Sequence, residues 1–185
     1  MIVITAGVNL VLGVTMATSA AMMTGWHQRS TADYTALQAA GAIATVLILL
    51  LLARIRVSLS TIGVVSCIGV FVGGMVNALS RSPLGYALGF ILVVGFDKMV
   101  NVFIRTHRSR IIPVADSGKA TGVIVLLNNL SQPLAGLLVG AHAAVADADA
   151  DSRAVILTLT LSMGAIAIVA ERSWQRALLV QCHLN

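Results

Sequence analysis

The sequence contains few charged residues for its length. Only 10% of its 185 residues are Asp, Glu, Lys or Arg, compared with roughly 25% in a typical soluble domain. So few charges cannot cover the surface of a water-soluble globule, and a hydrophobic content of 58% excludes a disordered chain. The two cysteines, Cys67 and Cys182, give neither a disulfide framework nor the spacing of metal ligands. We therefore expect a membrane protein with no metal and no cofactor.

Six long uncharged runs separate the charged residues. A helix needs about 20 apolar residues to cross the hydrocarbon core of a bilayer. Strands of a membrane barrel would be alternating segments of about ten residues, whereas these runs are continuous and longer. The sequence predicts an all-α polytopic membrane protein, with one six-helix domain over residues 1–185. The predicted spans are 2–24, 35–53, 57–79, 84–104, 121–146 and 154–170.

The basic residues are distributed unequally between the two predicted sides of the membrane. One side carries Arg54, Arg56, Arg105, Arg108, Arg110, Lys119, Arg172 and Arg176, and the other carries Arg29, Arg81 and Arg153. The more basic side is cytoplasmic by the positive-inside rule, so both termini are predicted to be inside. The net charge of +5 therefore indicates orientation rather than nucleic-acid binding. The expected location is a bacterial cytoplasmic (inner) membrane.

Asp97 and Lys98 are the two charged residues deep in a predicted span. A charged residue there costs about 2.5–3.5 kcal/mol on insertion scales, and such residues mark substrate or proton pathways. Asn101 and Arg105 follow Asp97 at four-residue steps and extend a polar stripe. Because adjacent helix positions point in different directions, we expect that Asp97 and Lys98 do not neutralise each other. In the alternative interpretation, Lys98 snorkels to the interface and Asp97 pairs with a neighbouring helix.

The span 121–146 carries several amides near its centre. Asn128, Asn129 and Gln132 need hydrogen-bond partners in lipid, and Pro133 removes a helical hydrogen bond and is expected to kink the helix. Such a helix lines a polar cavity or, alternatively, cross-links the bundle. Asn9 and Asn77 are weaker candidates. The predicted substrate or proton pathway consists of Asp97, Asn101, Asn128, Asn129, Gln132 and Asn9.

Glycine pairs spaced four residues apart occur at Gly69/Gly73, Gly85/Gly89 and Gly136/Gly140. Small residues at this spacing let helices approach closely in a membrane, so each pair is a candidate contact. Catalytic motifs are not found: the chain has one deep aspartate, no His-Glu-x-x-His and no Gly-x-Ser-x-Gly. We therefore expect a protein that is not an enzyme.

The segment between the fourth and fifth predicted spans has a distinctive pattern. A basic run, Arg108 and Arg110, precedes Ile112-Pro113, then Asp116, Gly118-Lys119 and Gly122, and the next helix contains Pro-Leu-Ala-Gly-x-Leu-x-Gly. This pattern resembles the cytoplasmic link between helices ten and eleven of major facilitator superfamily transporters, particularly the drug- and siderophore-exporter-like members. The link Ala-Arg-Ile-Arg-Val at 53–57 departs from the family, because it is shorter than the loop expected there.

The resemblance implies that the six spans correspond to helices seven to twelve, the C-terminal half of such a transporter. Helices seven, eight, ten and eleven would then border the central cavity, and the pathway residues named above fall on helices seven, ten and eleven. The implied function is secondary active transport of a small solute by alternating access, coupled to protons through Asp97. The implied partners are membrane lipid, the solute and a second six-helix half from the same or another chain. A non-transporting membrane scaffold or a truncated transporter remnant is the alternative.

Overall fold

The computed structural model describes residues 2–111, 117–143, 153–162 and 164–165, and every element in these ranges is helical. The elements are α1 (Ile2–Ala20), the π-helical turn η1 (Ala21–Trp26), α2 (Thr31–Arg54), α3 (Leu59–Leu79), α4 (Pro83–Ile111) and α5 (Ser117–Ala143). A shorter apolar helix covers Arg153–Ser162. The prediction of an all-α protein is confirmed for the described part of the chain.

Local sequence signals fix where the helices begin. Ser30 precedes α2, and its hydroxyl accepts from the Asp33 backbone N–H at 3.1 Å, while the Asp33 carboxylate accepts from the Ser30 N–H at 3.2 Å. This reciprocal pair is a capping box. Ser58 caps α3 by accepting from the Thr61 N–H at 3.1 Å. At the start of α4, Pro83 occupies a first-turn position where its missing N–H costs nothing.

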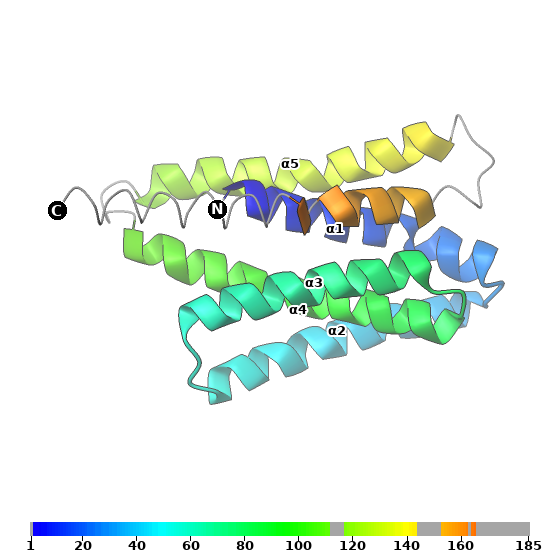
Figure 1. The fold of residues 1–185 in the computed structure, drawn as a ribbon, viewed down its shortest axis with the longest axis horizontal. Helices are drawn as coiled ribbons and strands as arrows, with labels where there is room; N and C mark the ends of the chain where they lie inside the picture. The colour runs from blue at the N-terminus through cyan, green and yellow to red at the C-terminus, as the bar shows by residue number, and fades with distance from the viewer. Residues whose placement is uncertain (1, 112–116, 144–152, 163, 166–185) are drawn as a thin grey trace.

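Successive helices run in opposite directions, and α1 lies between α5 on one side and the group α2, α3 and α4 on the other (Figure 1). Within that group, α4 packs against both α3 and α2. One buried cluster joins α1, η1, α2, α3 and α4, and a smaller one joins Val14, Ala78, Ala135 and Ile156. The most buried of the candidate spans is the α1–η1 segment. Central placement of the first helix gives its polar residues access to several neighbours.

Four of the described helices are long and apolar enough to cross a membrane: Thr5–Trp26, Thr31–Arg54, Leu59–Leu79 and Pro83–Ser109. The surface of α2 supports this assignment, because Ile43, Leu47 and Leu50 are each about 60% exposed along it. Such a face suits lipid rather than water. The four helices indicate an integral membrane protein. The count of six spans remains a prediction, because the predicted span 154–170 lies partly outside the described residues.

The structure extends several predicted spans. The predicted span 84–104 becomes α4, Pro83–Ile111, so Arg105 and Arg108 lie on a helix rather than in the predicted loop. The predicted span 121–146 becomes α5, which begins at Ser117 and continues through Pro133 to Ala143. Hydropathy marks only the apolar part of a helix, and backbone hydrogen bonding carries the helix beyond it into the polar region.

Glycines make the tightest helix contact, between α3 and α4. A Cβ on Gly73 would lie 3.0 Å from the Gly89 carbonyl oxygen, and a Cβ on Gly89 would lie 2.8 Å from the Gly73 carbonyl oxygen. The two backbones therefore touch where both side chains are absent. Gly136 and Gly140 on α5 have no neighbour within 4 Å in the described structure. Gly69, Gly73 and Gly89 of the first two predicted pairs thus lie at the α3–α4 contact, whereas Gly85 lies against Ser80 and Ser82 of the preceding connection. The third pair marks no contact among the described residues.

Candidate functional site

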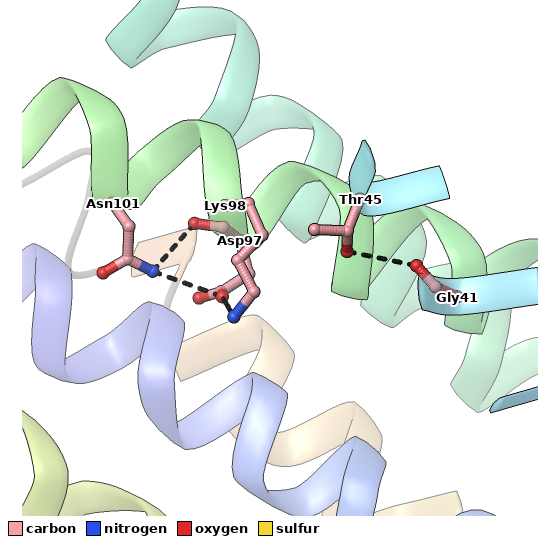
Figure 2. A network of polar contacts seen from close by, with 5 residues as sticks. All are labelled: Gly41, Thr45, Asp97, Lys98 and Asn101. Carbon is pink, nitrogen blue, oxygen red and sulfur yellow. Dashed lines mark hydrogen bonds and ion pairs between the residues drawn. The ribbon is translucent and has the colours of Figure 1, made fainter. Parts of the chain in front are cut away.

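Asp97 is the central feature of the candidate site. It stands midway between Pro83 and Ile111 on α4, and its side chain is 1% exposed. Neighbouring positions on the same helix, Val93 and Val100, are also buried. Figure 2 shows Asp97, Lys98 and Asn101 together on α4 beside α1. The predicted burial of an acidic group within the helix bundle is therefore observed.

The two oxygens of the Asp97 carboxylate have different environments. Oδ2 accepts from Lys98 Nζ at 3.0 Å and from Asn101 Nδ2 at 3.2 Å, and the Asn101 amide also donates to the Asp97 carbonyl oxygen at 3.0 Å. Oδ1 is buried and has no hydrogen-bond partner among the described residues. A buried carboxylate oxygen without a partner is costly unless it receives a proton or a cationic group. The arrangement leaves one acceptor free for such a group.

The expectation that Asp97 and Lys98 do not neutralise each other is wrong. Their side chains form an ion pair, with Lys98 43% exposed and Asp97 buried. The argument from adjacent helix positions applies to short side chains, whereas the flexible four-carbon stem of lysine lets its ammonium group reach the preceding residue. The hydrogen bonds between Asp97 and Asn101 confirm the first part of the predicted polar stripe. Arg105 does not extend the stripe within the bundle, because its side chain is exposed.

Two of the helices that pack against α4, namely α1 and α2, contribute different polar side chains. Asn9 on α1 is 8% exposed and therefore lies inside the bundle. On α2, the Thr45 hydroxyl donates to the Gly41 carbonyl oxygen at 3.1 Å, within its own helix (Figure 2). Thr18 likewise donates to the Val14 carbonyl oxygen at 2.8 Å. Hydroxyl groups that bond their own backbone add polarity to a membrane helix without needing an interhelical partner.

The structure does not bring the two described amides of α5 to Asp97. Asn129 and Gln132 are exposed, and the side chain of Asn128 lies outside the described residues. α5 contacts α1 through its backbone and a small residue instead: a Cβ on Gly13 would lie 2.8 Å from Ala135 Cβ and 3.1 Å from Gln132 Cα. Two amides are therefore displayed on an apolar helix, beside its contact with the central helix.

The predicted cytoplasmic loop motif is only partly described. Pro113, Asp116 and the side chain of Arg110 lie outside the described residues. Arg108 is half-buried near the end of α4, while Gly118, Lys119 and Gly122 are exposed in the first turns of α5. The motif therefore spans two helix ends and the connection between them.

A cluster that the sequence analysis missed lies at the end of the bundle where η1 and α3 end. Arg153 donates from Nε to the Ala78 carbonyl oxygen and from Nη2 to the Ser80 carbonyl oxygen, both at 3.0 Å. Its guanidinium lies over the Trp26 ring, 5.4 Å from the centroid. These contacts join three helices and satisfy carbonyl groups at the end of α3. The sequence placed Arg153 on the same side of the membrane as Arg29 and Arg81, but nothing in the sequence paired Arg153 with Trp26.

His27 belongs to the same cluster. Its ring lies 5.7 Å from the Tyr86 ring, and its Nε2 is buried with no hydrogen-bond partner among the described residues. Burial lowers the pKa of His27, and the charges of Arg153 and Arg29 lower it further. The imidazole is therefore held in its neutral form near neutral pH.

Asn77 is buried more deeply than its low ranking predicted. It is 0% exposed, and its two side-chain polar atoms have no partner in the described structure. The reason is the close α3–α4 contact, because a Cβ on Gly89 would lie 2.7 Å from the Asn77 backbone nitrogen. α3 therefore buries an amide where its partner helix α4 has no side chain.

Comparisons with known proteins do not add a family to this description. The chain matches no protein-family model, no curated protein and no solved structure. Among the described residues, no group of three His, Cys, Asp or Glu side chains is arranged to hold a metal ion. The function is therefore inferred from the residues of the chain and their contacts.

Proposed function

We propose that this chain is one half of a secondary active transporter, which moves a small solute across the membrane by alternating access. The observation that carries the proposal is the environment of Asp97, a buried carboxylate at the middle of a membrane-length helix. One oxygen is in an ion pair, and the other has no partner among the residues that the structure describes. In lipid, such a group persists where it serves a proton or substrate pathway.

The proposed role of Asp97 is to bind a proton or the cationic group of a solute. In the observed state, Lys98 neutralises the carboxylate, and Asn101 holds Oδ2 in place. A proton arriving at Oδ1 would remove the negative charge that holds Lys98. The side chain of Lys98 is 43% exposed, and its ammonium would then be free to turn toward the interface. Protonation and rearrangement of the site would thus be linked.

The exposure of Asn129 and Gln132 supports the proposal that a second half packs against this one. Exposed amides on an apolar helix are unfavourable against lipid but favourable against a polar cavity or a second half. We propose that this part of α5 faces the pathway, with the more basic end of the bundle in the cytoplasm. The cavity would be completed by a second six-helix bundle, either a second copy of this chain or a different chain that corresponds to the N-terminal half of such a transporter.

A non-transporting scaffold is the second candidate, and one observation favours it. A groove on the described surface is lined by residues of η1, α2 and α4, together with Arg29, and Asp97 is not among them. The scaffold interpretation treats the Asp97–Lys98 pair as a purely structural element. The two functions differ in whether water reaches position 97.

Cysteine labelling measures that difference. Asp97→Cys would be made in a chain carrying Cys67→Ser and Cys182→Ser, and membranes would be treated with a water-soluble maleimide. The matched control is Val93→Cys, one turn earlier on α4 and 0% exposed. The transport proposal predicts labelling at 97 but not at 93. Equal protection of both positions would favour the scaffold.

Transport is tested in inside-out vesicles with an imposed pH gradient and a cationic dye as the probe. We expect Asp97→Asn to abolish proton-coupled accumulation of the dye, because the neutral amide neither takes up nor releases a proton. The control is Arg81→Gln, which changes an exposed charge in the turn before α4. Unchanged accumulation by Asp97→Asn would remove Asp97 from the mechanism.

A further inference from the structure

An open groove of 340 Å³ lies between α2 and α4, away from Asp97. Its lining residues run from Arg29 and Pro83 to Ala40 and Ile91. The 27–30 and 80–82 connections next to Arg29 and Pro83 lie at the same end of the bundle (Figure 1). Ala36 and Ala40 on α2 are one turn apart, and Ala87 and Ile91 on α4 are also one turn apart. Short alanine side chains leave space there that larger residues would fill.

The walls of the groove are suited to a slender apolar occupant. Met23 and Leu37 are buried beneath it, and Leu84 at its edge is 77% exposed. The groove is continuous along α2 with the exposed residues Ile43 and Leu47, which form part of the lipid-facing surface. A hydrocarbon chain from the bilayer can therefore enter sideways without crossing a polar barrier.

The end of the groove carries one charge of each sign. Arg29 and Asp33 both line it, and both are exposed. The Arg29 guanidinium makes no hydrogen bond or ion pair within the described ranges, while one oxygen of Asp33 remains available beside the one that accepts from Ser30. Both residues flank the start of α2, at the depth where lipid headgroups lie. This pair of charges is complementary to a headgroup with a phosphate and an ammonium.

We propose that this groove binds one molecule of phosphatidylethanolamine. The lipid phosphate pairs with Arg29, the primary ammonium pairs with Asp33, and one acyl chain lies along Ala36, Ala40 and Ala87. Arginine suits the phosphate because its planar guanidinium can donate two hydrogen bonds to it. Asp33 disfavours an anionic headgroup, which has no cation for it to bind. It favours the primary ammonium over the quaternary ammonium of phosphatidylcholine, because only the primary ammonium has N–H groups to donate to the carboxylate. The proposal is independent of the transport function.

The test uses the full chain in lipid nanodiscs made from equal parts of phosphatidylethanolamine, phosphatidylcholine and phosphatidylglycerol. Native mass spectrometry measures which lipid remains bound when the protein is released. We expect one phosphatidylethanolamine to be retained preferentially. Arg29→Gln should lower the bound fraction about fivefold, as expected for loss of one partly exposed ion pair. Arg81→Gln, at the same end but outside the groove, should leave it unchanged.

A second variant tests the acyl-chain track separately. Ala40→Trp fills the groove and should abolish retention, whereas Ala39→Trp is the matched control, since Ala39 is exposed on α2 and does not line the groove. Circular dichroism verifies that both proteins remain helical. Equal retention by the two tryptophan variants would overturn the site. Equal retention of phosphatidylglycerol and phosphatidylethanolamine by the unmodified chain would overturn the proposed headgroup contacts.

Discussion

The α3–α4 contact gives the most direct test of the fold. In Gly89→Ala, the new methyl group would lie 2.7 Å from the Asn77 backbone nitrogen and 2.8 Å from the Gly73 carbonyl oxygen, and it would also clash with the Asn77 side-chain oxygen. Backbone atoms cannot move aside as a flexible side chain can, so the helices must separate. Overpacking of this kind costs about 1–3 kcal/mol.

Alanine also has a higher helix propensity than glycine, by about 1 kcal/mol in soluble helices. The net loss expected for Gly89→Ala is therefore about 0–2 kcal/mol. The same substitution at Gly136 adds a methyl group where nothing lies within 4 Å in the described structure. There the propensity gain is not opposed, and we expect stability to be unchanged or up to about 1 kcal/mol higher.

The assay is reversible unfolding in mixed micelles, with helix content followed by circular dichroism as the fraction of denaturing detergent rises. The two variants should differ by about 2 kcal/mol, equivalent to roughly a thirtyfold change in the folded-to-unfolded ratio. Equal stability of Gly89→Ala and Gly136→Ala would refute the close approach of α3 and α4. A lower stability of Gly136→Ala would instead show that α5 has a partner there.

Two further predictions concern the cluster around Arg153. Arg153→Gln should lower the free energy of unfolding by about 2 kcal/mol, because it removes the hydrogen bonds to Ala78 and Ser80 and the contact with Trp26. The control Arg81→Gln should have little effect on the free energy of unfolding. Equal effects of the two substitutions would contradict the role of Arg153 in the cluster. For His27, whose pKa is lowered from 6.5 by burial, Arg153 and Arg29, the unfolded chain binds a proton at a higher pH than the folded chain. Melting temperatures should therefore fall as the pH decreases below about 6.5, and His27→Gln should reduce this fall; an unaltered pH profile would exclude His27 as its source.

The general architecture was predictable because hydropathy and charge act locally. Uncharged runs identified helices at the positions of α1 to α5, and the small residues at Gly73 and Gly89 identified a contact. The C-terminal end of α4 was not predictable from hydropathy, since the polar last turns of the helix are held by backbone hydrogen bonds. The π-helical turn at Ala21–Trp26 also has no clear pattern in the sequence.

The candidate site also has features that the sequence predicts and features that it does not. The sequence determined that Asp97 lies near the middle of a helix and that Asn101 follows on the same face, because both facts depend only on spacing along one helix. It did not predict the Lys98–Asp97 ion pair, which depends on how a long side chain bends, or the exposure of Asn129 and Gln132, which depends on how α5 packs against α1.

By itself, the sequence determined that these helices belong in a membrane, because the transfer free energy of a segment depends mainly on its own composition. The tertiary structure decided which face of each helix is covered. That choice gives Asp97 one partnered oxygen and one with no partner in the described part of the chain, places Arg153 across the end of α3, and opens a groove beside Arg29. These features depend on the packing of residues that are distant in the chain, which no local pattern specifies.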